Sequence, residues 1–191
     1  TPNRQDCLGV SGISRDLSAS KSGNYLRKEF SKIDGSFDSP VDVKIEDQVM
    51  CPAFASRYIK NVKNCESPDW LKSKLKSIGL RPISALVDIT NYVMYDQNRP
   101  LHVYDADKIN KNIIVRSAKD KETLKALDEK EYALSKGMCV IADDMSPLGL
   151  GGIMGGESTG CSENTTNVLL ESALFDPCLL YTSDAADDNV G

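Results

Sequence analysis

The chain has 191 residues, 40% of them hydrophobic, a formal net charge of −5 and a single histidine. This length and apolar fraction are sufficient for a globular domain with a buried core. The acidic charge excludes a broad basic field, so contact with nucleic acid would be local or assisted by a partner. No apolar run approaches the roughly 18 residues that a membrane-spanning helix needs, which excludes such a helix.

The six cysteines and the lone histidine argue against a metal centre. No C-x-x-C pair occurs, and one histidine cannot complete a structural zinc site. The sequence has no signal-peptide pattern at Thr1. We therefore predict no bound metal, reduced thiols and a cytoplasmic location.

The first predicted element is a short helix through Val10, Ile13 and Leu17, and we interpret residues 1–20 as the end of a preceding domain. The polar residues 21–48 predict a linker, in which the alternating run VDVKI can form a strand. A further strand is predicted in CPAFASRYIKNV, near the start of a domain over residues 49–177.

Two helices are predicted next. In SPDWLKSKLKSIGLRP, Ser67 is expected as the N-cap, Pro68 at the first helical position and Gly79 at the end. The apolar face of this helix consists of Leu71, Leu75 and Ile78. The second helix ends before Pro100, because proline cannot continue it. Its periodic residues are Leu86, Ile89, Thr90 and Val93.

After His102 the apolar runs become shorter. The runs NIIVRSA, TLKAL, EYAL, MCVIADD and NVLLESALF are rich in Val, Ile, Leu and Tyr and are separated by turn residues, which is typical of short strands. Helices followed by a series of short strands predict an α+β fold rather than a doubly wound sheet.

Four polar residues are candidates for chemistry. Thr90 and Asn91 offer a hydroxyl and an amide, and their alternative roles are capping or surface polarity. Glu171 either faces solvent or points inward, where it needs a hydrogen-bond donor because burying an unpaired carboxylate is costly. His102, within NRPLHVYDADKI, is by its own pattern either a structural residue or a chemical one.

The run PLGLGGIMGGESTG is dense in glycine. It has neither the G-x-x-x-x-G-K-[ST] pattern nor G-x-G-x-x-G after a strand, so it does not predict a nucleotide site. Two alternatives remain open: the backbone approaches a ligand through exposed amide groups, or it bends tightly within a sheet.

Several runs together resemble one family. They are CPAFASRYI, WLKSKLKSIGLRPISALVDITNYVM, PLHVYDADKI, GLGGIMGGE and VLLESALFDP. Their order resembles the central editing module of the bacterial phenylalanyl-tRNA synthetase beta subunit, and TPNRQDCLGVSGISRDLSA resembles the segment just before it. The resemblance covers residues 1–177. It implies a tRNA-editing domain that supports phenylalanyl-tRNA aminoacylation by hydrolysing tyrosine wrongly esterified to tRNA(Phe).

The resemblance also implies the site. The family's pocket residues correspond to Thr90, Asn91, His102, Gly151, Gly152 and Glu171. His102 would act on a water molecule or bind the terminal adenosine, and Thr90 and Asn91 would position the water or the amino group. Amides near Gly152 would face the ester oxygen. Glu171 would accept a hydrogen bond from the tyrosine hydroxyl, and would therefore select the substrate without catalysing.

One position departs from the family pattern. The family usually has alanine where this chain has Gly151, so the resemblance implies a wider or looser pocket wall here.

The resemblance further implies tRNA(Phe) and an alpha subunit as partners, in an enzyme of two alpha and two beta chains that does not involve a membrane. ATP and magnesium would serve the parent enzyme, with no cofactor in this segment. Two other hypotheses are a structural or RNA-binding module that lacks hydrolysis and a free-standing editing hydrolase.

The C-terminal run CLLYTSDAADD matches the translation of an adapter used in transposon-based DNA library preparation. We therefore expect residues 178–191 to be a sequencing artefact and exclude them from fold reasoning. The alternative is a native acidic tail.

Overall fold

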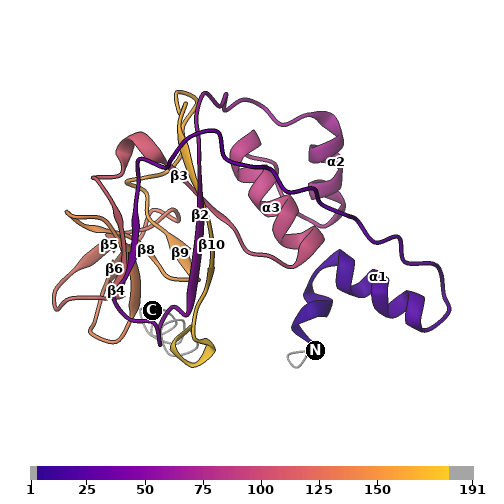
Figure 1. The fold of residues 1–191 in the computed structure, drawn as a ribbon, viewed down its shortest axis with the longest axis horizontal. Coiled ribbons are helices and arrows are strands. Elements are labelled where there is room, and N and C mark those ends of the chain that lie inside the picture. Colours follow the sequence, from indigo (N-terminus) through magenta and orange to yellow (C-terminus); the bar gives the residue numbers. More distant parts are fainter. Residues whose placement is uncertain (1–3, 181–191) are drawn as a thin grey trace. The chain divides into compact units, whose positions relative to one another are not determined.

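The computed structural model describes residues 4–180, which form two compact units (Figure 1). Among these residues the first unit consists of residues 4–38 and Glu66–Leu101, and the second of Ser39–Cys65 and residues 102–180. This division follows packing, and the domain limits predicted at residues 20, 48 and 177 stay predictions. Most of the suspected artefact, residues 181–191, lies outside the described residues.

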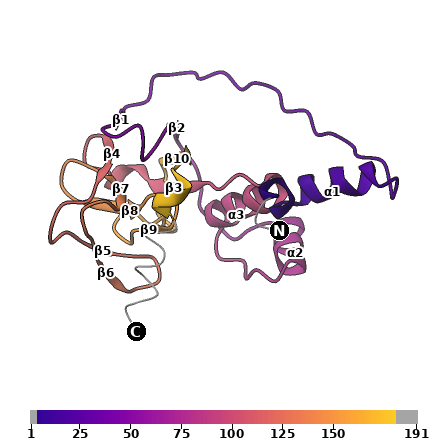
Figure 2. The same cartoon turned by 90° about the horizontal axis from the view of Figure 1, so that it is seen from below.

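The first unit is helical. Its elements are Gln5–Leu8 (η1, a 3₁₀ helix), Val10–Ala19 (α1), Asp69–Ser77 (α2) and Ala85–Gln97 (α3). The three α-helices confirm the helices predicted from apolar periodicity. Figure 2 shows α2 and α3 side by side, and Leu71 and Leu75 of α2 are almost fully buried. Ile78, predicted on the same face, is 43% exposed because α2 ends one residue before it.

The start of α2 differs from the prediction. Its N-cap residue is Pro68, and no side chain caps the helix. The hydroxyl of Ser67 instead donates to Asp88 Oδ2 at 2.5 Å, and the amide of Ile83 donates to Asp88 Oδ1 at 2.9 Å. Asp88 lies in α3 and is completely buried. The two bonds therefore satisfy its carboxyl group and join the starts of the two helices.

The second unit contains three sheets (Figure 1). Their strands are Val43–Ile45 (β1), Ala53–Ile59 (β2), His102–Asp105 (β3), Ile113–Ser117 (β4), Thr123–Lys125 (β5), Glu131–Ala133 (β6), Cys139–Ala142 (β7), Pro147–Leu150 (β8), Met154–Gly155 (β9) and Val168–Leu174 (β10). The largest sheet has the strand order β1-β4-β7-β8-β9, the next has β2-β10-β3, and in the third β5 pairs with β6. The presence of helices in one unit and of small, mainly antiparallel sheets in the other confirms the α+β fold class.

Every run predicted as a strand contains one, whereas β3, β8 and β9 were not predicted. β8 begins with Pro147, at a point where the register with β7 shifts, and proline is tolerated at such irregularities. β8 and β9 pair as an antiparallel hairpin across residues 151–153. The glycine-rich run therefore contains a tight bend within a sheet, the second of its two alternatives, and the approach of a ligand to its amide groups stays a prediction.

The strand register of the three-stranded sheet determines which of its polar residues lie on the same face. β10 is the central strand, with Glu171 opposite His102 of β3, and with Leu169 opposite Tyr104. Opposed residues, and residues two apart on one strand, lie on the same face. His102, Tyr104 and Glu171 therefore share a face. The buried cluster on this side also includes residues of the five-stranded sheet, namely Ile113, Val115, Ile141 and Leu148.

Candidate functional site

Glu171 is an almost buried carboxyl group on the central strand, with 5% of its surface exposed. The hydroxyl of Tyr104 donates a hydrogen bond to Glu171 Oε2. The two residues are diagonal neighbours across the β3–β10 pair, a separation that an aromatic side chain can bridge. Among the described residues, no hydrogen-bond donor is recorded for Oε1. The Glu171 side chain therefore points into the protein, as in the second of its two alternatives, and one of its two carboxyl oxygens has a hydrogen-bond donor.

Burial changes the charge states around Glu171. It raises the pKa of the Glu171 carboxyl from 4.5 to about 7, although the hydrogen bond from Tyr104 opposes this rise. Burial lowers the pKa of His102 from 6.5 to about 4, so its imidazole is neutral at pH 7. The pKa of Tyr104 is raised well above 10, first by burial and then by the charge of Glu171. The site thus holds a neutral imidazole beside a carboxyl that titrates near neutral pH.

His102 is held by an aromatic neighbour and a glycine. Its ring lies edge-on to that of Tyr104, with 4.4 Å between ring centroids and 70° between planes. The imidazole also lies against Gly155. A Cβ placed on this glycine would lie 2.3 Å from His102 Cε1. Real Cβ atoms do not come this close, so only glycine at position 155 leaves room for the imidazole in this position.

Gly151 and Gly152 lie at the hairpin turn next to Phe175, with Gly151 buried and Gly152 exposed. A Cβ on Gly151 would lie 2.8 Å from Phe175 Cε1, and one on Gly152 would lie 2.9 Å from Phe175 Cδ2. The missing methyl at position 151 therefore leaves room for the Phe175 ring, and its effect on the width of a pocket stays a prediction. The Gly151 amide donates to Cys139 O at 2.8 Å. The Gly152 amide has no recorded acceptor within residues 4–180, and its φ of +74° is in the left-handed region.

Thr90 and Asn91 lie within α3, in the first unit. Thr90 is buried, and its hydroxyl donates to the carbonyl of Val87 at 2.8 Å. This bond is neither a helix cap nor surface polarity, the two alternatives considered for the residue. Asn91 is half-buried. Their predicted roles near an ester stay predictions.

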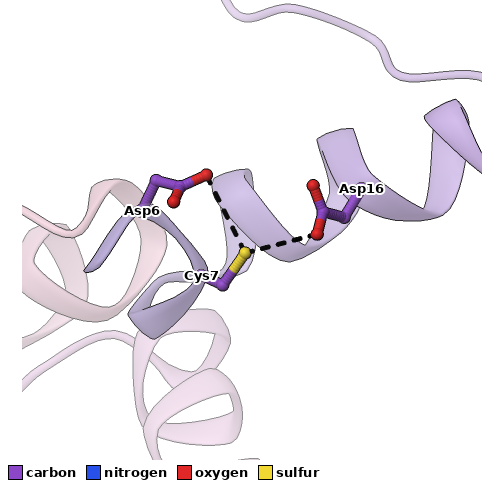
Figure 3. Close-up of side chains that lie close together, drawn as sticks. All are labelled: Asp6, Cys7 and Asp16. Carbon is purple, nitrogen blue, oxygen red and sulfur yellow. Dashed lines mark hydrogen bonds between the residues drawn. The ribbon is translucent and has the colours of Figure 1, made fainter. Parts of the chain in front are cut away.

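One group of potential metal ligands occurs among residues 4–180. It consists of Asp6, Cys7 and Asp16 in the first unit (Figure 3). The guanidinium of Arg4 bonds to both carboxylates, at 3.0 Å to Asp6 and 2.7 Å to Asp16, and Arg15 also bonds to Asp6. These arginines hold the pKa of Asp6 well below its usual range, whereas burial raises that of the Cys7 thiol. The group is therefore an ion-pair network, with its negative charges already neutralised.

The structure brings Glu171 and His102 together on one sheet face, and Gly151 and Gly152 together at one turn of the same unit. Sequence reasoning did not single out Tyr104, Gly155 or Phe175. The alternation in LHVYD, with two ring side chains two residues apart, was a signal for the first. Gly155 lies within the glycine-rich run but was not distinguished from the other glycines there. Nothing in the local sequence indicated Phe175.

Comparison with known proteins assigns the family. The B3/4 domain family matches residues 50–186, more than half of the chain. The chain belongs to the B3/4 domain family. The match extends over both compact units, since it includes Glu66–Leu101 of the first.

The relatives of this B3/4 domain agree with the resemblance found in the sequence. It is 57% identical over 175 residues to the phenylalanine-tRNA ligase beta subunit of Rhodopseudomonas palustris, covering 92% of this chain and 22% of that one. It is 52% identical over 186 residues to that of Brucella abortus, covering 96% and 23%. The chain therefore spans about a fifth of the length of the curated relatives it matches.

The fold also has a solved counterpart. The crystal structure of an N-terminal fragment of the phenylalanyl-tRNA synthetase beta subunit from Pyrococcus horikoshii matches with a TM-score of 0.54 and 16% identity. The match covers 96% of this chain and 58% of that one. At this identity it supports the α+β fold only. Among residues 4–180, no helix has the length and apolar character needed to span a membrane.

Proposed function

We propose that this B3/4 domain is a segment of a phenylalanine-tRNA ligase beta subunit and hydrolyses tyrosine esterified to tRNA(Phe). The observation that carries the proposal is Glu171, a buried carboxyl group with one oxygen held by Tyr104 and the other without a donor among the described residues. An unpaired acceptor of this kind, on a side chain that is 5% exposed, is suited to a ligand that brings its own hydroxyl group.

The substrates explain why such an acceptor is needed. Tyrosine exceeds phenylalanine by one hydroxyl, and an apolar pocket rejects such an analogue only about a hundredfold. A second site that requires the hydroxyl discriminates in the opposite direction. Phenylalanine would leave the Glu171 carboxyl without its partner, whereas tyrosine would donate to Oε1. Glu171 therefore selects the substrate and takes no part in bond cleavage.

His102 is the proposed group nearest the ester. It lies opposite Glu171 across the β3–β10 pair, and its lowered pKa keeps the imidazole neutral, so that a ring nitrogen can accept a hydrogen bond. It would orient an attacking water molecule or bind the terminal adenosine of the tRNA. The Gly152 amide would donate to the ester oxygen.

The remaining partners belong to the proposed complete enzyme. They are tRNA(Phe), the alpha subunit in an assembly of two alpha and two beta chains, and ATP with magnesium for aminoacylation, in the cytoplasm. The segment itself would contribute proofreading hydrolysis to that enzyme.

A deacylation assay tests this function. The complete enzyme that carries this domain is mixed with Tyr-tRNA(Phe) or Phe-tRNA(Phe), and release of each amino acid is followed. We expect Glu171→Ala to reduce the preference for tyrosine by about tenfold or more, and to lower the maximal rate much less. Glu163→Ala, which removes an exposed acidic side chain of the same unit, is the matched control.

Two outcomes would contradict the proposal. Loss of rate in Glu171→Ala with the preference intact would show that Glu171 is not the selector. Absence of preferential tyrosine release by the unsubstituted enzyme, with tRNA binding retained, would favour a structural or RNA-binding module that has the fold without hydrolysis.

A further inference from the structure

Tyr104 is the residue that fixes the conformation of Glu171. Its hydroxyl is the one recorded hydrogen-bond donor to this carboxyl group among residues 4–180, and it binds Oε2. Tyr104 is 1% exposed, and its ring packs against both His102 and the core. A ring held on several sides keeps its hydroxyl in one place, so the bond restricts rotation of the carboxyl group about its last torsion.

We propose that Tyr104 is a positioning residue that holds Glu171 Oε2 and so presents Oε1 to the hydroxyl of a bound tyrosyl ester. The proposal rests on the proposed function of this site. It assigns the two carboxyl oxygens different tasks: Oε2 accepts a permanent hydrogen bond from the chain, and Oε1 accepts one from the substrate.

The same bond adjusts the charge of the selector. A phenol that donates to a carboxyl group stabilises the ionised form, and Tyr104 accordingly lowers the pKa of Glu171, against the larger rise caused by burial. The other titratable groups near this carboxyl are His102, Cys51 and Cys139. Burial keeps these three neutral around pH 7, because it lowers the pKa of the imidazole and raises the pKa of each thiol. Tyr104 therefore favours the charged and stronger acceptor at neutral pH.

Tyr104→Phe tests the proposal, because it removes the hydroxyl and keeps the ring. Deacylation of Tyr-tRNA(Phe) and Phe-tRNA(Phe) by the complete enzyme is measured from pH 6 to 8.5, with KM and kcat separated. We expect the preference for tyrosine to fall about tenfold at pH 7.5, mainly through a higher KM for Tyr-tRNA(Phe). We also expect the pH midpoint of this preference to move upward. A purely structural role of Tyr104 would not move that midpoint.

Tyr132→Phe is the matched control. It removes another tyrosine hydroxyl that donates to a carboxylate in the same unit, Asp128, at 2.7 Å, but at the surface. We expect it to leave both the preference and its pH midpoint unchanged.

The effect of Tyr104→Phe must pass through Glu171. In a Glu171→Gln background, where position 171 cannot titrate, Tyr104→Phe should no longer move a pH midpoint, and its effect on the preference should shrink. Should Tyr104→Phe fail to fold, 3-fluorotyrosine at position 104 keeps the ring and provides a stronger donor. We expect it to move the midpoint downward, opposite to the phenylalanine variant.

The possible results separate this proposal from the function it rests on. An unchanged preference and midpoint in Tyr104→Phe, in an enzyme that does prefer tyrosine, would overturn the role of Tyr104 alone. A higher preference would show that Tyr104 competes with the substrate, which also overturns it. If the unsubstituted enzyme shows no preference, the proposed function fails first.

Discussion

The backbone of Gly155 faces the imidazole of His102, and no other residue type fits there without displacement. A methyl group at this position would lie 2.3 Å from His102 Cε1 and 3.1 Å from Leu127 Cδ1. Leu127 is a turn residue that is 51% exposed and can move, whereas the His102 ring is held against Tyr104 in β3. We therefore expect Gly155→Ala to lower the free energy of unfolding by about 1–3 kcal/mol, mainly through the clash with the imidazole. Chemical denaturation measures this change.

The control for Gly155 is Gly23→Ala, since no atom lies within 4 Å of a Cβ added there. It should change stability by less than about 0.5 kcal/mol. Equal effects of the two substitutions would show that Gly155 does not limit the position of the imidazole.

Single residues also show how much of the site could be predicted from the sequence. The need of an inward-pointing Glu171 for a hydrogen-bond donor could be predicted, because it follows from the chemistry of one carboxyl group. It could not identify Tyr104, which is 67 positions away and meets Glu171 only through the β3–β10 register. The role of Gly155 was equally hidden, since its contact with His102 joins two strands of different sheets.

At the scale of elements, Asp88 joins α2 to α3. Asp88→Ala would leave the hydroxyl of Ser67 and the amide of Ile83 without their acceptor. We expect the free energy of unfolding to fall by about 2–3 kcal/mol, and Ser67→Ala, which removes one bond, to cost less. The single tryptophan reports this packing, since Trp70 of α2 lies edge-on to Tyr92 of α3 at 5.5 Å. Its fluorescence should therefore change with Asp88→Ala.

Asp120→Ala, in an exposed turn, is the control for Asp88. It should alter neither stability nor the Trp70 emission. An Asp88→Ala variant with unchanged emission and stability would contradict the connection between the two helices.

Local periodicity was sufficient for most elements. The helices and the longer strands follow from apolar spacing, which depends only on neighbouring residues. The exceptions have tertiary causes. Ser67 resembled an N-cap, yet the buried Asp88 takes its hydroxyl. β8 and β9 are short and rich in glycine, and they exist because β7 provides a partner strand.

At the scale of the whole molecule, two buried groups should give opposite pH dependences of stability. Glu171 has a raised pKa, so its contribution to stability falls as pH rises from 4.5 to about 7. His102 has a lowered pKa, so its contribution rises from pH 4 to 6.5. The two slopes oppose each other between pH 4.5 and 6.5, and the unsubstituted chain should show little change there from this pair.

Glu171→Gln separates the two contributions. It keeps the acceptor for Tyr104 but removes the titration, so the variant should gain stability relative to the unsubstituted chain as pH rises from 4.5 to 7. A pKa change of this size corresponds to roughly 3 kcal/mol. His102→Asn should show the opposite trend. Parallel pH curves for all three proteins, measured by denaturant unfolding, would refute the burial of these groups.

The spatial arrangement of the elements could not be predicted from the sequence patterns. The parallel pairing of β1 with β4 joins segments about 70 residues apart, and nothing in either short run indicates the other. Two helices of the first unit also interrupt the second, between β2 and β3. The order of the predicted helices and strands indicated the α+β class, whereas the set of proposed site residues came from the resemblance to a known family, which periodicity alone could not have supplied.

The position of β10 has a consequence for biosynthesis. It is the central strand of its sheet, but it leaves the ribosome roughly 70 residues after β3. At a translation rate of about 5–20 residues per second, the edges of β2 and β3 stay unpaired for several seconds before β10 is synthesised. During this time they can pair with other nascent chains. Glu171, the residue proposed to select the substrate, lies on that last strand. Under the proposed function, the selecting carboxyl group and the partner strand that covers these edges would be acquired in the same step of translation.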